Sequence, residues 1–374
     1  MSQRTRFLGR DVHAKTIAVA IADDAGPPED YDAIANDPGA LRKLVVRVGG
    51  DGVRLVAAYE AGATGFALHR QLTTLGLECT VVAPSLIPRR PGDRVKTDRR
   101  DALKLCRLLR SGDLTAVWVP DEEHEALRDL VRARSDAKQD EVRAKHRLSK
   151  LLLRRGITPP VGARPWTRAY LLWLDQLRCD YLADQIVLDD YRHQVRAARE
   201  RVAQLDASLV QCAGDGRYTV LLRALQAFRG IGFLTAVTIV AEAGDMRRFA
   251  TARQFMTFTG LVPSEYSSGA VRRTGHITRA GNRGLRHVLG ESAHHARHVP
   301  ALTTTLRRRQ RGLPREITEA SWRAQHRLHY RYLVGRLGKP IALTAIAREL
   351  AGFIWGTPRV PVGQSRLALS SIAA

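Results

Sequence analysis

The order of apolar runs and helical patterns along the chain constrains its fold more than any other feature. In the first 120 residues, apolar runs of strand length alternate with stretches of helical periodicity, whereas the remainder is almost wholly helical in pattern. We expect strands at residues 7–12, 16–22, 53–59 and 79–83, and helices at residues 38–48, at 64–75 and from Thr97 onward. Strands interleaved with helices predict an α/β domain with a mixed sheet over residues 1–120.

The helical remainder contains one strict heptad pattern. A long helix is expected from Asp121 to Arg155. Further on, apolar residues recur at alternating spacings of three and four, at Leu188, Tyr191, Val195, Ala198, Val202, Leu205 and Leu209. Such an a/d seam favours a coiled coil, so we expect residues 121–215 to form a helical segment that self-associates, and residues 216–374 to form a mainly helical third domain. The alternative is an amphipathic helix that packs within its own chain.

Positive charge is concentrated in the C-terminal part. The chain holds 60 Lys and Arg against 37 Asp and Glu, a formal net charge of +23, and residues 211–374 hold 25 basic and 8 acidic residues. Basic side chains neutralise phosphates and release counterions, so this imbalance favours a nucleic-acid-binding protein. The run at Arg307, Arg308 and Arg309 is one candidate phosphate contact. The alternatives are a solvated basic face and, less favoured because no basic helix pairs with exposed large apolar residues, a membrane-surface protein.

The cysteines and the apolar runs indicate the cellular compartment. Cys79, Cys106, Cys179 and Cys212 lie far apart without a C-x-x-C pair, which argues against a disulfide framework and against a structural zinc site. The most apolar run, residues 232–244, is about half as long as a membrane span requires. We therefore expect a cytoplasmic protein that does not enter a membrane.

Four carboxylates of the first domain form a candidate metal site. Asp11 lies at the end of the first expected strand and Glu60 directly follows the third, at a strand end where α/β sheets place their ligands. Asp98 and Asp101 are three residues apart at the start of a helix and therefore share one of its faces. Four carboxylates brought together repel each other unless a cation compensates, and hard oxygen ligands suit the Mg²⁺ that assists phosphoryl transfer. Taken singly, Asp98 also fits a solvated helix acid, and Asp11 a turn hydrogen bond.

The C-terminal part carries further candidate contacts to nucleic acid. Gly230 and Gly232 have the spacing of a helix-hairpin-helix, whose glycine turn lets backbone N–H groups approach a phosphate, although a plain helix–helix turn has the same pattern. Guanidinium groups are permanently charged forks that suit phosphates, which makes a group of later arginines candidates as well. These arginines are Arg272, Arg273, Arg279, Arg283 and Arg286.

Two successions of motifs resemble one family of transposases. The first domain contains Gly9-Arg10-Asp11-Val12-His13-Ala14-Lys15, Tyr59-Glu60-Ala61 and Lys96-Thr97-Asp98-Arg99-Arg100-Asp101-Ala102. The C-terminal part contains Ala241-Glu242-Ala243-Gly244-Asp245, Phe258-Thr259-Gly260-Leu261-Val262-Pro263, Ser267-Ser268-Gly269, Gly281-Asn282-Arg283 and Leu285-Arg286. Together they look like the RuvC-like DEDD domain and the C-terminal transposase domain of the insertion-sequence-110 (IS110) family.

The resemblance implies a fold, partners and a mechanism. The first domain would have an RNase H-like fold, with Asp11, Glu60, Asp98 and Asp101 as the DEDD tetrad. Members of the family are recombinases guided by a structured noncoding bridge RNA that pairs with donor and target double-stranded DNA. The resemblance implies that Ser268, or its neighbour Ser267, attacks the DNA and forms a phosphoserine link. It also implies a homo-oligomer, a dimer that assembles into a tetrameric synaptic complex.

Two other functions fit the same residues. A metal-dependent junction resolvase or nuclease would use water as its nucleophile, and Ser268 would then be incidental. A non-catalytic nucleic-acid-binding protein would use the four acids only structurally. A covalent protein–DNA adduct distinguishes the three, because the recombinase forms it, the nuclease cuts DNA without it, and the binding protein does neither.

Overall fold

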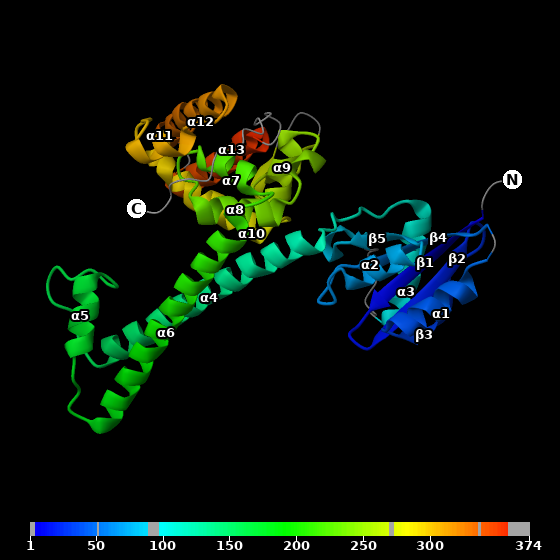
Figure 1. Ribbon diagram of the computed structural model, residues 1–374, viewed down its shortest axis with the longest axis horizontal. Helices are drawn as coiled ribbons and strands as arrows, with labels where there is room; N and C mark the ends of the chain where they lie inside the picture. The colour runs from blue at the N-terminus through cyan, green and yellow to red at the C-terminus, as the bar shows by residue number, and fades with distance from the viewer. Residues whose placement is uncertain (1–3, 51, 89–96, 269–272, 336–337, 358–374) are drawn as a thin grey trace. The chain divides into compact units, whose positions relative to one another are not determined.

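The computed structural model describes residues 4–50, 52–88, 97–268, 273–335 and 338–357. The chain divides into two units, Met1–Pro120 and Asp121–Ala374. Figure 1 shows a sheet with covering helices in the first unit and helices almost throughout the second. The division coincides with the change of sequence pattern near residue 120, and the further boundary expected at residue 215 stays a prediction.

A five-stranded mixed sheet, in the order β3-β2-β1-β4-β5, forms the first unit. The strands are β1 (Thr5–Val12), β2 (Thr16–Asp23), β3 (Glu29–Ala35), β4 (Arg54–Glu60) and β5 (Glu78–Val82). β2 is antiparallel to β1 and β3, whereas β4 runs parallel to β1 and β5. The prediction of β1, β2, β4 and β5 is confirmed. The sequence does not predict β3, because this edge strand is rich in acidic residues and mostly exposed.

Helices cover both faces of this sheet. α1 (Pro38–Val48) and α2 (Ala67–Thr74) bury Leu41 and Leu72 against one face, in a cluster with Leu8 of β1. α3 (Asp98–Ser111) packs on the opposite face, where the cluster is made mainly of small residues. α3 begins at the expected cap, Thr97, whose hydroxyl accepts a hydrogen bond from the Arg100 amide. A short 3-10 helix, η1 (Pro84–Leu86), follows β5.

α3 lies so close to β1 that glycine is required at position 9. A Cβ built on Gly9 would lie 2.2 Å from both the Ala102 carbonyl oxygen and the Cys106 amide nitrogen. Since strand side chains alternate, Gly9 and Asp11 face the same helix. The close packing therefore sets the distance between β1 and the first residue of α3, Asp98.

The second unit begins with a long helical hairpin. α4 (Glu122–Arg154) and α6 (Leu182–Ala213) lie side by side, with α5 (Arg168–Gln176) near the tip of the hairpin (Figure 1). The seam residues Leu188, Val195, Val202 and Leu209 are buried within the single chain, and the first two share a cluster with Leu148 of α4. The seam thus packs within its own chain, as the alternative interpretation predicts, and self-association through this segment stays a prediction.

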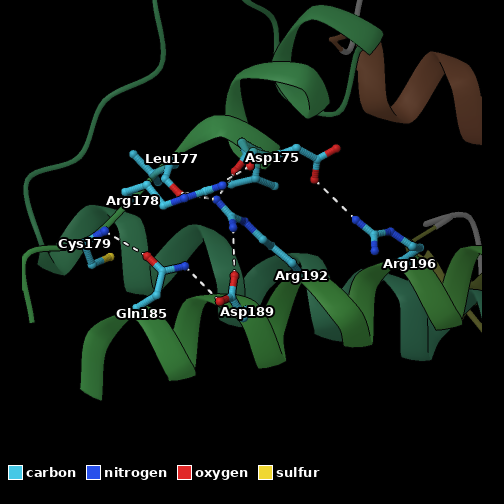
Figure 2. A network of polar contacts seen from close by, with 9 residues as sticks. Asp175, Leu177, Arg178, Cys179, Gln185, Asp189, Arg192 and Arg196 are labelled. Carbon is cyan, nitrogen blue, oxygen red and sulfur yellow. Dashed lines mark hydrogen bonds and ion pairs between the residues drawn. The ribbon is translucent and has the colours of Figure 1, made fainter. Parts of the chain in front are cut away.

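Arg192 of α6 fastens α5 to the hairpin (Figure 2). Its guanidinium donates to the Leu174 and Leu177 carbonyls at the end of α5, the latter at 2.7 Å, and to Asp189 Oδ1 at 2.8 Å. The last carbonyls of a helix lack donors from a following turn. Arg192 therefore adds a donor to two carbonyls that already accept from the Leu177 amide and from Arg178. We interpret the network as a structural junction.

The rest of the second unit is helical apart from a two-stranded hairpin. Its helices are α7 (Thr219–Gln226), α8 (Phe233–Ala243), α9 (Ala252–Thr259), α10 (Arg283–Ala293), α11 (Thr304–Gln310), α12 (Arg315–Leu333) and α13 (Lys339–Trp355), with the short 3-10 helices η2 (Met246–Arg248) and η3 (His294–Arg297). The hairpin consists of β6 (Pro263–Glu265) and β7 (Thr274–Ile277). Phe228, Phe255 and Ile346 are fully buried in the core that these helices enclose. In the described part of the chain, no helix is both long and apolar enough to cross a membrane.

Candidate functional site

Asp11, His13 and Asp98 meet at the carboxyl end of β1. Asp11 is the penultimate residue of β1 and His13 follows the strand directly, while Asp98 is the first residue of α3. His13 Nε2 lies 3.5 Å from Asp11 Oδ2 and 3.3 Å from Asp98 Oδ2. One potential ligand atom from each residue lies within 4.8 Å of the other two. Within the described residues, this is the only such group of three or more His, Cys, Asp or Glu side chains.

Glu60 and Asp101, the other two predicted acids, lie at the same end of the sheet but outside this group. Glu60 is the last residue of β4, which runs parallel to β1, so the carboxyl ends of the two strands share one edge. Asp101 lies one turn into α3 and shares a helix face with Asp98. Both side chains are half-buried. The structure thus brings two of the four predicted acids into close contact through His13 and leaves the other two beside them.

His13 is a site residue that the sequence analysis does not predict. A signal was present, since Asp11 and His13 are two residues apart at a strand end, and side chains at that spacing share a face. The contact with Asp98 carries no such signal, because it depends on how α3 packs on β1. That packing in turn depends on Gly9.

The donor set fits a divalent metal ion. Carboxylate oxygens are the ligands that Mg²⁺ and Mn²⁺ prefer, whereas an imidazole nitrogen suits transition metals such as Zn²⁺ or Fe²⁺. Asp11 is mostly buried, with a side chain 17% exposed, while Asp98 and His13 face solvent, so an ion could enter from outside. Asp11, Asp98 and His13 are therefore able to hold a cation, and the mixed set does not by itself select one metal.

The serines lie on the β6–β7 hairpin. Ser267 Oγ donates a hydrogen bond to Glu265 Oε1 at 2.8 Å, and Ser268 is exposed. Both hydroxyls are therefore at the surface of the second unit. Arg272, the first arginine of the predicted contacts, lies outside the described residues, and Arg273 is exposed.

Three predicted arginines gather on residues 279–286, the loop before α10 together with the first turn of that helix, which we call the arginine turn. Burial, and then the charges of Arg279 and Arg283, lower the pKa of Arg286 below its ordinary value. In the described part of the chain no carboxylate forms an ion pair with any of the three; the one protein acceptor, for Arg286 Nη1, is the Thr259 carbonyl at 3.0 Å. Uncompensated like charges at one place attract anions, so the turn is suited to bind a phosphate.

Backbone contacts hold the arginine turn against the end of α9. The Asn282 amide donates to the Phe258 carbonyl at 2.8 Å, and a Cβ on Gly281 would lie 2.3 Å from that same oxygen. Arg279 has a φ of +54°, a conformation that non-glycine residues rarely adopt. These contacts hold the backbone of the loop against α9.

The other predicted contacts differ in their surroundings. Gly230 has a φ of +86° and lies against α10, where Ser292 Oγ donates to its carbonyl at 3.1 Å, while Gly232 caps α8. Arg309 is half-buried and donates to the Ile231 carbonyl at 3.2 Å, so it supports this turn. These contacts match a packed helix–helix turn, and phosphate binding there stays a prediction. Arg307 and Arg308 are exposed and available to a polyanion.

Comparison with known proteins identifies the family. A DEDD transposase model of the IS110 group matches residues 8–156, and a model described as transposase IS116/IS110/IS902 family matches residues 222–306. The chain is 40% identical over 361 residues to the putative transposase y4qE of Sinorhizobium fredii, covering 95% of this chain and 89% of that protein. The chain belongs to the IS110 family of transposases. It is also 29% identical over 333 residues to the transposase for insertion sequence element IS1533 of Leptospira borgpetersenii, covering 88% of this chain and 96% of that protein.

Family membership makes the chain a transposase, an enzyme that recombines DNA. The DEDD designation implies a divalent metal, and the matched residues include the Asp11, His13 and Asp98 group. The five-stranded sheet with helices on both faces is consistent with the RuvC-like fold that the sequence predicts. The name DEDD refers to the acidic residues that carry the catalysis. A role for Ser268 is not part of it and stays a prediction.

Proposed function

We propose that this transposase cuts and rejoins DNA strands with Mg²⁺ held by Asp11, Glu60, Asp98 and Asp101. The meeting of Asp11, His13 and Asp98 within 4.8 Å, at the sheet edge that Glu60 also occupies, is the observation that carries the proposal. When bound, the ion would neutralise phosphate charge and ease deprotonation of the nucleophile. The His13 imidazole lies between the two carboxylates, with Nε2 3.5 Å from Asp11 Oδ2 and 3.3 Å from Asp98 Oδ2.

The second unit supplies the phosphate contacts in this proposal. The side chains of Arg279, Arg283 and Arg286 bind a DNA phosphate, because they lack a carboxylate partner within the described residues. The exposed Arg307 and Arg308 bind the DNA backbone as well. Arg272 and Arg273, near the serines in sequence, and the turn at Gly230 and Gly232 are additional contacts to nucleic acid in the same proposal.

The nucleophile in this proposal is Ser268 Oγ. Its attack on a phosphodiester forms a Ser–O–P ester, breaks one P–O bond of the strand and leaves a DNA hydroxyl, to which the proton passes. Attack by that or another DNA hydroxyl on the ester rejoins a strand and restores the serine, so no external energy source is needed. The exposure of Ser268 supports the assignment. Ser267, whose hydroxyl donates to the Glu265 carboxylate, is the adjacent alternative.

A structured bridge RNA directs the reaction in this proposal. Base pairing selects donor and target DNA, while the protein binds the RNA through its shape and backbone. The synaptic complex is a homo-oligomer, a dimer or a tetramer, and it works in the cytoplasm, in agreement with four free cysteine thiols. Sequencing the RNA that copurifies with the protein tests this part, and recovery of no discrete species would argue against a guide.

Trapping on a suicide DNA substrate tests the proposed chemistry. Wild-type protein with Mg²⁺ should give cleaved DNA and a denaturant-resistant adduct whose modified peptide contains Ser268. Ser268→Ala should give neither product, and Ser267→Ala, the matched control, should retain both. Modification at Ser267 would shift the assignment by one residue. Cleavage by wild-type protein and by Ser268→Ala, without an adduct in either, would establish water as the nucleophile and the chain as a nuclease.

A further inference from the structure

Glu242 is a buried carboxylate that the proposed chemistry does not use. It lies near the end of α8, with its side chain 6% exposed. Arg132 of α4 donates to both of its oxygens, from Nε to Oε1 at 2.9 Å and from Nη2 to Oε2 at 3.0 Å. Burial alone would raise the pKa of Glu242, but the hydrogen bonds from Arg132 and Asn282 outweigh it and lower that pKa. Glu242 is therefore ionised, and its charge is directed at two partners.

The second partner of Glu242 is Asn282, which lies in the arginine turn and caps the start of α10. Asn282 Nδ2 donates to Glu242 Oε2 at 2.6 Å, which fixes the orientation of the side-chain amide. Asn282 Oδ1 can then accept a hydrogen bond from the Leu285 amide at 2.9 Å and cap α10. Gly284 allows the close approach, since a Cβ there would lie 3.3 Å from Glu242 Cγ. Glu242 thus anchors the turn from inside the core.

The arginine turn needs such an anchor. Like charges repel, and burial together with the charges of Arg279 and Arg283 lowers the pKa of Arg286. Repulsion of this kind favours any rearrangement that spreads the charges apart. Only the carboxylate of the Arg132–Glu242 pair is buried, since the Arg132 side chain is 55% exposed, and a pair of this kind adds little net stability. The pair is better explained by the geometry that it imposes on Asn282.

We propose that Glu242 is a positioning residue that holds the arginine turn in its phosphate-binding geometry and ties it to helix α4 through Arg132. The inference rests on the proposed role of Arg279, Arg283 and Arg286 as phosphate ligands. It adds that the long hairpin helix and the phosphate site are coupled through one buried carboxylate. A substitution of Arg132 in α4 would therefore change the geometry of the arginine turn.

The test is a double-mutant cycle on the full chain, read from the salt dependence of binding to a DNA duplex of random sequence. The variants are Glu242→Gln, the triple replacement of Arg279, Arg283 and Arg286 by Ala, and their combination. Each lost phosphate contact flattens the slope of log Kd against log salt by roughly 0.9 for B-DNA, so the triple variant should flatten it by up to about 2.7. Glu242→Gln should produce a large part of that change, and adding it to the triple variant should produce no more.

Glu141→Gln is the matched control. Glu141 is as buried as Glu242, with a side chain 5% exposed, and it pairs with Lys138 and Lys145 inside α4. Its replacement should lower the melting temperature to a similar degree and leave the salt slope unchanged. If Glu242→Gln fails to fold, Arg132→Lys replaces it in the cycle, since lysine keeps the charge but cannot donate as a fork, and part of the flattening is then expected.

Two outcomes would overturn the inference while the arginines keep their role. One is a folded Glu242→Gln, or a folded Arg132→Lys, with a lower melting temperature and the wild-type slope, which would make the pair purely structural. The other is a full additive effect of Glu242→Gln on top of the triple variant. A wild-type slope in the triple variant itself would instead remove the arginine turn from the proposed function, and the inference with it.

Discussion

Replacing Gly9 by alanine tests whether α3 sets the geometry of the acidic centre. The added Cβ would lie 2.2 Å from the Ala102 carbonyl oxygen and the Cys106 amide nitrogen, and 2.7 Å from Cys106 Cα. These are backbone atoms of α3, so they cannot rotate away. Since nonbonded carbon contacts are most favourable near about 3.5 Å, the helix must retreat by about 1 Å. Asp98 moves with it, away from Asp11.

Two effects of this retreat have known sizes. Overpacking of a close-packed core costs about 1–3 kcal/mol, so the melting temperature of the Gly9→Ala protein should fall. A displacement of about 1 Å within a reacting constellation costs about 10²-fold in rate. We therefore expect strand cleavage to fall by about that factor, while binding to a DNA duplex is unchanged because the basic surface lies in the second unit.

Single-turnover DNA cleavage and thermal unfolding, measured on the same preparations, check both numbers. Gly50→Ala is the matched control in the same unit, since the nearest atom to a Cβ there is Val53 Cγ2 at 3.6 Å. A wild-type melting temperature for Gly9→Ala would refute the close packing of α3 on β1. A lower melting temperature with a full cleavage rate would refute the link between this packing and the acidic centre.

Three further predictions concern the second unit. Replacing Arg307 and Arg308 by Ala should flatten the salt dependence of DNA binding by roughly 0.9 per lost contact, and an unchanged slope would mark them as a solvated face. Placing Asp at both Val195 and Val202 of α6 should unfold the α4–α6 hairpin, because both side chains are buried, and circular dichroism should report the loss of helix. A folded variant of lower mass in solution would return the seam to self-association. Burial lowers the pKa of His124, so this side chain is neutral in the folded protein. The stability of the fold that depends on a neutral His124 is complete above about pH 6.5, the ordinary pKa of histidine, and should be lost as the pH falls. The melting temperature should therefore decline on acidification less steeply in His124→Gln than in wild type, and equal declines would contradict this.

Local pattern was enough to predict most of the first unit. Apolar runs of strand length predict four of its strands, and Thr97 predicts the start of α3, because these signals depend on near neighbours in sequence. β3 lacks such a signal, since an exposed edge strand paired only with β2 needs no apolar face. The heptad pattern predicts a buried seam correctly, but it cannot tell whether the covering helix comes from the same chain.

The candidate site was predictable at the level of residue types and less so at the level of contacts. The sequence predicts the four acids because each stands at a strand end or a helix start; they are Asp11, Glu60, Asp98 and Asp101. His13 was missed because its link to Asp98 depends on tertiary packing. The Glu242 anchor was missed for the same reason, since its partners Arg132 and Asn282 lie 110 and 40 residues away along the chain.

Strand cleavage measured against Mg²⁺ concentration tests the acidic centre most directly. Wild-type protein should cleave DNA at a rate that rises with Mg²⁺ and vanishes in a chelator. Asp11→Asn should abolish cleavage at every Mg²⁺ concentration while DNA binding persists, because it removes a ligand charge and keeps the side-chain volume, and Glu60→Gln and Asp101→Asn should do the same. Asp32→Asn, an exposed carboxylate on β3, is the control and should cleave normally. A wild-type rate for Asp11→Asn, or full cleavage in the chelator, would contradict a metal-dependent centre at this sheet edge.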